Sequence, residues 1–154
     1  MKATLVTAVF AVALALIGST VAGAADHQVK MLNKGASGAP MVFEPSFLAI
    51  EPGDSVTFVP TDKGHDAQSI KGMMPDGAAP FVGKMNQQVT VGFDTGGVYG
   101  VKCAPHYGLG MVALIVVGND ASNLAAAQAV KQPGKAKQAF ASLFDQLNTV
   151  LAGQ

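Results

Sequence analysis

Between Gln28 and Gly118, short apolar runs alternate with turn signals, a pattern that is typical of an all-β domain. In the clearest run, Val89, Val91 and Phe93 occupy every second position and would share one face of a strand. The runs that we predict as strands are 29–32, 47–50, 55–60, 88–93, 97–101 and 112–117. Short strands at this spacing predict a sandwich or barrel, and no internal repeat is visible.

The pattern changes after Gly118, where the helix-favouring residues alanine, lysine and glutamine become frequent. Ser122 or Asn123 would cap a first helix that runs to about Val130, and Pro133 fits the first turn of a second helix. The second helix carries one apolar stripe with helical spacing, made of Phe140, Leu143, Phe144, Leu147, Val150 and Leu151. We expect this stripe to pack on the strands, which is a commoner fate than binding a partner.

The first 24 residues have the pattern of a signal peptide. Lys2 supplies a positive start, an apolar run extends from Leu5 to Ile17, and Ala22-Gly23-Ala24 offers small residues for cleavage. This run of about 13 residues is shorter than the roughly 20 that a membrane-spanning helix needs. We therefore expect a mature chain that begins Ala25-Asp26-His27, export to the bacterial periplasm, and a solvated His27.

The length of 154 residues corresponds to one domain. We divide it into a signal peptide, 1–24, a β domain, 25–120, and a helical extension, 121–154, that packs on the sandwich. With 49% hydrophobic and 13% charged residues, the chain should fold compactly. The net charge is zero, and −1 once Lys2 is removed, so no general basic field favours nucleic acid. All ten basic residues are lysines, which argues against tight anion recognition.

One segment, 98–111, concentrates the candidate chemistry. It holds the only cysteine, Cys103, and His106 and Met111 follow it within nine residues. A thiolate, an imidazole and a thioether suit copper better than magnesium or calcium. A trigonal copper site for electron transfer needs a second imidazole, and His65, which lies 38 residues before Cys103, is the best candidate. The predicted metal ligands are therefore His65, Cys103, His106 and Met111.

Each of these residues also has a plainer interpretation. A lone cysteine is often an inert core residue, a single histidine is as often structural, and methionine commonly fills cores. Three donor types at this spacing favour a metal site instead. A copper-storage protein would use similar donors, and reversible redox cycling would distinguish it. A Cys-His hydrolase would need an orienting third residue and an oxyanion site, for which there is no matching motif, so we expect no enzyme.

The motifs around these residues resemble those of the pseudoazurins, small type I copper proteins of the cupredoxin family. The resemblance covers essentially the whole mature chain, including the two-helix tail. The matching motifs are Met31–Gly35, Met41–Pro45, Pro60–His65, Val98–Cys103 and Pro105–Gly108.

The resemblance implies an eight-stranded Greek-key β-sandwich with copper near one end and a two-helix extension at the carboxyl end. It also implies a soluble periplasmic electron carrier that holds one type I copper ion and donates electrons to denitrification reductases such as nitrite reductase. We expect a monomer that makes transient contacts with redox partners and binds neither nucleic acid nor, after signal cleavage, membrane. The expected contact surface is an apolar rim of Met41, Pro105 and Leu109 around His106, with these lysines outside it: Lys34, Lys63, Lys84 and Lys102.

Two positions beside the candidate ligands depart from the family pattern. The family usually has Asn after its first ligand histidine and Thr after its ligand cysteine, a pair that ties the two ligand loops together. Here these positions hold Asp66 and Ala104, so the residues alone do not predict the family's cross-loop hydrogen bond. An ionised Asp66 near the metal would stabilise Cu(II) and lower the reduction potential.

Overall fold

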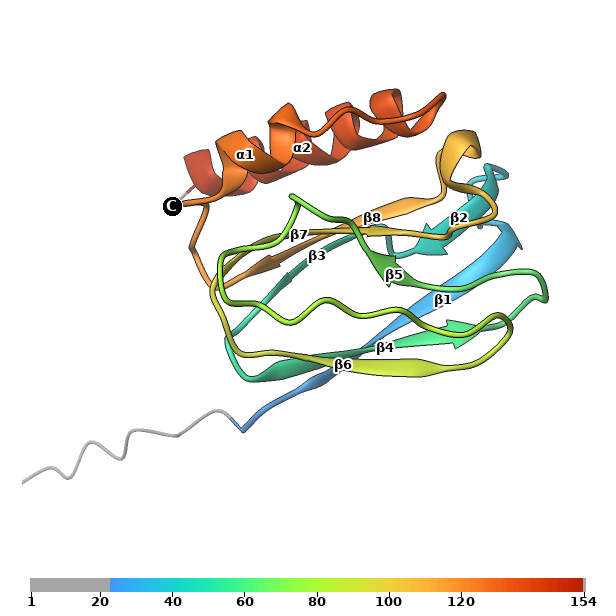
Figure 1. Ribbon diagram of the computed structural model, residues 1–154, viewed down its shortest axis with the longest axis horizontal. Helices are drawn as coiled ribbons and strands as arrows, with labels where there is room; N and C mark the ends of the chain where they lie inside the picture. Colours follow the sequence, from blue (N-terminus) through green and yellow to red (C-terminus); the bar gives the residue numbers. More distant parts are fainter. Residues whose placement is uncertain (1–22, 154) are drawn as a thin grey trace, which may run out of the picture.

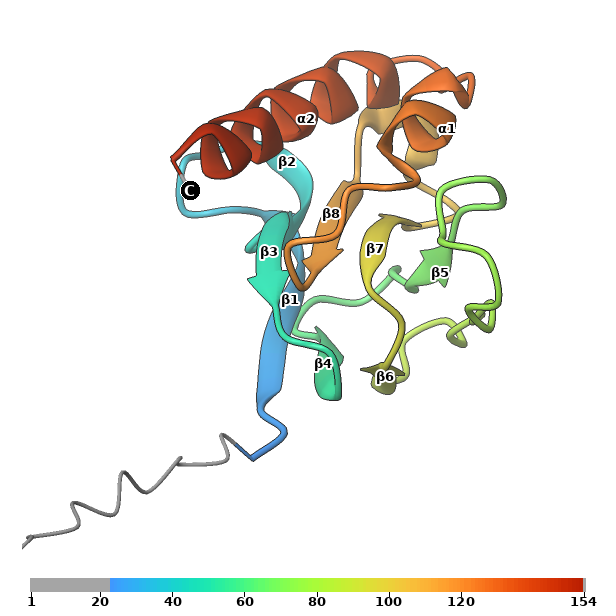
Figure 2. The same ribbon diagram turned by 90° about the vertical axis from the view of Figure 1, so that its left-hand side faces the viewer.

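The computed structural model describes residues 23–153, so the predicted signal peptide, except Gly23 and Ala24, lies outside the described residues. Eight strands in this part of the chain form two four-stranded sheets packed face to face (Figure 1 and Figure 2). In spatial order, the first sheet contains β2 (Pro40–Glu44), β1 (Asp26–Lys34), β4 (Asp54–Pro60) and β6 (Val89–Phe93). The second contains β3 (Phe47–Ile50), β8 (Val112–Val117), β7 (Gly97–Lys102) and β5 (Gln68–Ser69). The prediction of an eight-stranded sandwich is therefore confirmed.

The two sheets mix parallel and antiparallel pairs. β1 pairs with β4 in parallel and with β2 in antiparallel orientation, while β8 pairs with β3 in parallel and with β7 in antiparallel orientation. The predicted runs at 47–50 and 112–117 coincide with β3 and β8, and the other four overlap β1, β4, β6 and β7. The strands β2 and β5 were not predicted, because β2 begins with Pro40 and ends before Pro45, and β5 has only two residues.

β8 is buried on both faces, which explains its unbroken apolar sequence. Ala113, Ile115 and Val117 face the core between the sheets, and the alternate residues face the helices. The helices α1 (Leu124–Ala129) and α2 (Ala136–Ala152) cover this outer face of the second sheet (Figure 1). On α2, the residues packed against the sheet include Phe140 and Leu147. The apolar stripe therefore packs on the sandwich over most of its length.

The first helix begins directly after Asn123, as predicted, but its predicted side-chain cap is absent, and the predicted start of the second helix is wrong. Asn123 precedes α1 but makes no side-chain cap, because its side chain exchanges two hydrogen bonds of 2.8 Å with the backbone of Val98 on β7. Pro133 lies outside α2, which begins at Ala136, since Gly134 between them has a left-handed φ of +49°. A side chain at Gly134 would collide with the carbonyl oxygen of Gly108, to which Lys135 donates a 2.9 Å hydrogen bond. This contact docks the start of α2 on the loop that follows β7.

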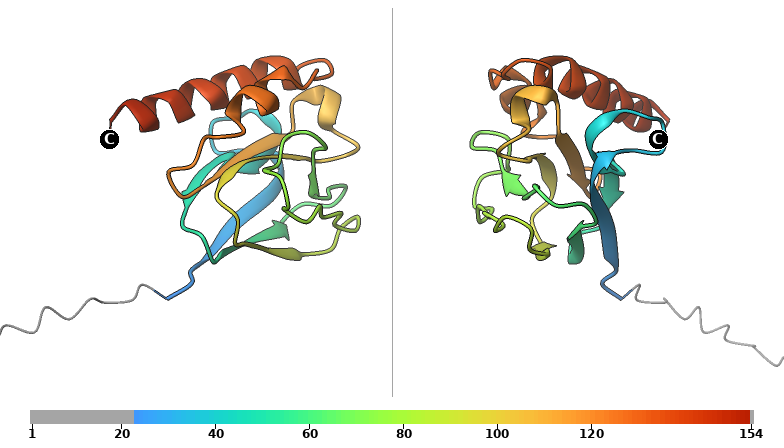
Figure 3. Two further views of the ribbon diagram at one scale, coloured as in Figure 1. Left: turned by 60° about the vertical axis from the view of Figure 1, so that its left-hand side comes forward. Right: turned by 90° about the vertical axis from the view of Figure 1, so that its right-hand side faces the viewer.

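The segments that carry the candidate chemistry meet at one end of the sandwich. The loop between β4 and β5 and the loop between β7 and β8 lie at this end together with the final residues of β1 (Figure 1). The first described residues lie at the opposite end, and Figure 3, right, looks onto the candidate end. No helix within residues 23–153 is long and apolar enough to cross a membrane.

Candidate metal centre

His65 is held in one orientation on the loop between β4 and β5. Its side chain is fully buried, and its ring atom Nε2 lies 3.0 Å from Oδ1 of Asn33 on β1. Because the amide oxygen of Asn33 accepts, Nε2 carries the hydrogen and donates, which leaves the lone pair on Nδ1. The carbonyl of His65 also accepts a 2.8 Å hydrogen bond from the amide of Asn86. His65 therefore presents Nδ1 as a fixed donor atom toward the second loop.

Cys103, His106 and Met111 lie on the loop from β7 to β8, which is closed by its own backbone hydrogen bonds. The amide of Cys103 donates to the carbonyl of Met111 over 3.0 Å, and the amide of Met111 donates to the carbonyl of His106 over 3.2 Å. The short helix η1 (Tyr107–Leu109) and Gly110, at φ 95°, complete the turn. Cys103 and Met111 are fully buried, whereas His106 is half-buried.

The donor atoms of His65, Cys103 and His106 form a compact triangle. The two Nδ1 atoms lie 3.1 Å apart, and Sγ of Cys103 lies 3.7 Å from Nδ1 of His65 and 3.5 Å from Nδ1 of His106. With these side lengths, the centre of the triangle lies about 2.0 Å from each of the three donor atoms. Bonds from transition metals to nitrogen and sulfur are about 2.0–2.3 Å long. The triangle therefore fits one metal ion.

The chemistry of the donor set selects among metals. Two imidazoles and one thiolate arranged as a triangle, with space for a weak axial sulfur, are typical of copper sites for electron transfer, whereas calcium and magnesium require oxygen ligands. Met111 is fully buried and its backbone is bonded to both Cys103 and His106, so it belongs to the same loop closure. Its role as the axial ligand stays a prediction.

Burial sets the protonation of the metal-free donors. It lowers the pKa of His65, and the neighbouring His106 lowers it further, and both effects favour the neutral imidazole, which is the form that binds metal. Burial raises the pKa of the Cys103 thiol, so the entering metal must displace a proton from sulfur. Loading of the site should therefore become easier as the pH rises.

The two ligand loops are tied together by Asp66. Oδ1 of Asp66 accepts a 2.7 Å hydrogen bond from the backbone amide of Ala104, and Oδ2 accepts a 2.9 Å hydrogen bond from the side chain of Gln68. The residues at these positions did not predict a cross-loop hydrogen bond, but one is present. It uses a backbone donor, so it needs no hydroxyl at position 104.

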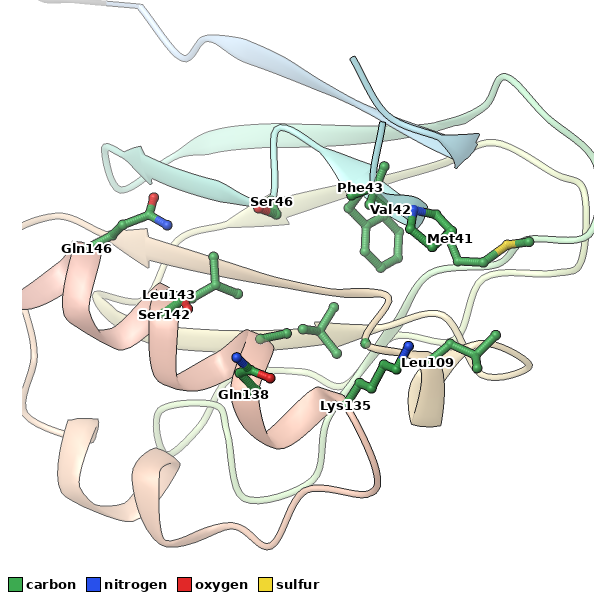
Figure 4. A pocket seen from close by; sticks show the side chains of 15 residues that line it. Met41, Val42, Phe43, Ser46, Leu109, Lys135, Gln138, Ser142, Leu143 and Gln146 are labelled. Carbon is green, nitrogen blue, oxygen red and sulfur yellow. The ribbon is translucent and has the colours of Figure 1, made fainter. Parts of the chain in front are cut away.

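The rim around His106 is largely apolar and borders a groove. Leu109 is 53% exposed, Pro105 is exposed and Met41 is half-buried. Met41 and Leu109 lie at one end of a groove between β2 and α2, and Gln146 lies toward its other end (Figure 4). Sequence reasoning missed Lys135, which lines this groove, and Asn33, which orients His65. No local signal places Asn33 beside a residue 32 positions away, because their contact depends on how β1 and β4 pair.

His27 is placed differently from the expectation. It is far from the candidate metal centre at the opposite end of β1, and it is not fully solvated. Its Nε2 lies 2.8 Å from Oδ2 of Asp54, and its side chain is 31% exposed. The parallel pairing of β1 with β4 brings these two residues together.

Comparison with known proteins points to one family. Residues 29–118 match the family model of copper binding proteins of the plastocyanin/azurin family. A pseudoazurin from Paracoccus pantotrophus is 48% identical over 90% of this chain and 95% of its own length. Two solved pseudoazurin structures are also similar. The one from Methylobacterium extorquens AM1 has a TM-score of 0.76 at 49% identity and covers 79% of this chain and 98% of its own. The one from Sinorhizobium meliloti has a TM-score of 0.78 at 46% identity and covers 80% and 96%.

Proposed function

The chain belongs to the pseudoazurins, within the plastocyanin/azurin family of copper-binding proteins, and we propose that it delivers electrons to periplasmic denitrification reductases such as nitrite reductase. Bound copper supplies a one-electron couple between Cu(I) and Cu(II), so the protein is an electron carrier and not an enzyme. The ligands that we propose for its single type I copper are His65, Cys103, His106 and Met111.

The donor triangle is the observation that carries this proposal. Its three donor atoms surround a point that lies at metal-bonding distance from each of them. Asn33 and burial hold His65 in place, and the β7–β8 loop carries Cys103 and His106. A site held in this way changes little when an electron arrives or leaves, which favours fast transfer. Cys103 and the two histidines would provide the strong bonds, and Met111 would provide the weak axial contact that tunes the potential.

The exposure of the ligands supports electron transfer to the partner through His106. His65 and Cys103 are fully buried, whereas His106 is half-buried and is surrounded by the apolar rim of Met41, Pro105 and Leu109. A partner that docks on this rim would approach the metal through the imidazole of His106. A small apolar contact suits a transient complex, because the carrier must leave after each transfer.

Lysines near this end would guide an acidic partner. Lys34, Lys63 and Lys84 are exposed, and Nζ of Lys102 lies 5.2 Å from the ring centre of Tyr107 beside His106. Such charges accelerate the encounter and are screened beyond about 8 Å at physiological salt. The rate of electron transfer should therefore fall as ionic strength rises. We also propose that the carrier is a monomer.

The location in the periplasm depends on the predicted signal peptide, 1–24. Its removal would leave the β domain, 25–120, and the helical extension, 121–154, as the mature protein. The positive start, the apolar run and the small residues before Ala25 support this division.

A stopped-flow experiment with purified copper nitrite reductase tests the partner. Reduced, copper-loaded protein should be oxidised when reductase and nitrite are both present, and the rate should fall with added salt. Leu109→Glu should slow this reaction, because it places a charge in the proposed contact surface. Val150→Glu is the matched control, since Val150 is also exposed but lies near the end of α2. Equal slowing by both variants, or no oxidation, would refute the proposed partner while leaving the copper site untouched.

A further inference from the structure

Ala25, which directly precedes β1, and His27 in β1 bring nitrogen atoms together at the end of the sandwich remote from the candidate metal centre. The backbone nitrogen of Ala25 lies 2.8 Å from Oδ1 of Asp54, and Nε2 of His27 lies 2.8 Å from Oδ2 of the same carboxylate. Two groups that are bonded to one carboxylate lie close to each other. The nitrogen of Ala25 and the imidazole of His27 are thus neighbours in the folded protein.

Cleavage after Ala24 would change the chemistry of this neighbourhood. The nitrogen of Ala25 would become a free amine, and the mature chain would begin Ala25-Asp26-His27. A free amine, the next two backbone amides and a histidine at the third position can close three fused chelate rings around one ion. Four nitrogen donors in a plane suit Cu(II) and Ni(II).

The hydrogen bonding of His27 leaves the required ring atom available. This chelate uses Nδ1, which is the ring nitrogen nearer the backbone. Asp54 accepts a hydrogen bond from Nε2, so in the neutral imidazole Nδ1 holds the lone pair, and Nδ1 makes no hydrogen bond within the described chain. A carboxylate behind a metal-binding histidine fixes its tautomer and strengthens the bond to the metal, which is the place that Asp54 would take.

The start of β1 is also accessible. Ala25 and Asp26 are exposed, and the side chain of His27 is 31% exposed. β1 pairs with β2 only from Lys30 onward, so its first residues have one neighbouring strand, β4. Residues 25–27 can therefore wrap around an ion by releasing the pairs Asp26↔Ser55 and His27↔Val56, without disturbing the pairing of β1 with β2.

We propose that the mature protein binds a second Cu(II) ion through the amine of Ala25, the amides of Asp26 and His27, and Nδ1 of His27. Binding releases three protons, one from the terminal ammonium and one from each amide. The two amide anions balance the charge of the ion, and no electron is transferred. His27 lies six residues before Asn33, or about 20 Å along an extended strand, so this site is separate from the candidate electron-transfer centre.

Titration of copper-loaded protein tests the proposal. The chain is prepared with Ala25 as its first residue, supplied with one equivalent of Cu(II), and then titrated with a second equivalent while absorption and electron paramagnetic resonance spectra are recorded. One control begins at Gly23, which moves His27 to the fifth position, and the other carries His27→Gln in the chain that begins at Ala25. The Ala25 chain should bind the second ion roughly 100-fold more tightly than either control, because each control breaks the four-nitrogen chelate. Its resonance signal should show nitrogen ligands in a plane.

Equal binding by all three chains would overturn the proposal, and it would indicate that Asp54 keeps the terminal ammonium as an ion pair. The comparison does not depend on the redox partner, so it stands or falls separately from the proposed function. The intact mass of the exported protein decides whether the site exists after natural processing. A first residue other than Ala25 would exclude it there.

Discussion

The amide of Ala104 donates a 2.7 Å hydrogen bond to Oδ1 of Asp66, and this bond joins the loop of His65 to the loop of Cys103. Asp66 is buried and directly follows His65, so its charge acts on both candidate ligands. Burial is the main cause of the shifted pKa values of His65 and Cys103, but the charge of Asp66 raises both. Asp66 is thus both a structural link and a source of negative potential at the metal.

Asp66→Asn should raise the reduction potential. The amide keeps an oxygen for Ala104, so the link is retained while the charge that stabilises Cu(II) is removed. A partly screened charge at close range contributes about 1–2 kcal/mol, which corresponds to tens of millivolts for one electron. Voltammetry measures the change. Asp94→Asn, in an exposed turn after β6, is the control, and an unchanged or lower potential in the Asp66 variant would contradict this role.

Asn33→Ala should weaken copper binding. The amide oxygen of Asn33 lies 3.0 Å from Nε2 of His65, and it sets both the tautomer and the orientation of the ring. Loss of such an outer partner typically lowers metal affinity about 10- to 100-fold. Competition with a chelator measures the affinity, with Asn148→Ala on the exposed face of α2 as control. If both variants bind copper as tightly as the parent, Asn33 does not orient the ligand.

Leu147→Ala should destabilise the protein without changing the copper site. Leu147 is fully buried between α2 and the second sheet, and replacing a buried leucine by alanine costs about 2–5 kcal/mol. Val150→Ala, at a side chain that is 38% exposed on the same helix, should cost much less. Chemical denaturation measures both. Similar losses for the two variants would mean that α2 is not packed as described.

Asp54→Asn should make stability less sensitive to acid. Hydrogen bonds from Ala25, from His27 and from the amide of Glu51 hold the pKa of Asp54 below its ordinary value of 3.8. As the pH falls, the Asp54 carboxylate of the unfolded chain is therefore protonated before that of the folded chain. The ionised carboxylate stabilises the fold above about pH 4, and this stabilisation is lost as the pH falls further. The variant should melt at a lower temperature than the parent at pH 7, and the difference should shrink below pH 4. A difference that is constant with pH would exclude the carboxylate as its cause.

The strands with clear sequence patterns were predicted well. Val89, Val91 and Phe93 alternate along β6, and the apolar run of β8 ends at turns on both sides. β2 was missed because Pro40 belongs to it, and proline normally argues against a strand. The start of α2 was misplaced because the left-handed turn at Gly134 is required by its contact with Gly108, which no local pattern reveals.

The candidate site was predicted by chemical type and spacing, but its supports were not. Cys103 and His106 lie three residues apart on one loop, so their proximity follows from the sequence, and His65 was chosen as the missing imidazole. The structure places the donor atoms of all three within 4.8 Å of one another. Asn33 and the bond between Asp66 and Ala104 depend on strand pairing and on backbone groups, so residue types alone could not identify them.

The most direct test of the proposed copper site is the visible absorption spectrum of the purified protein after addition of one equivalent of Cu(II). An intense band from the Cys103 thiolate to Cu(II) should appear, bleach on reduction and return on oxidation. The Cys103→Ser variant should bind Cu(II) without showing this band, because it lacks the thiolate. A parent protein that stays colourless with copper bound would contradict the proposed ligand set, and the triangle of donor atoms from His65, Cys103 and His106 would then need another explanation.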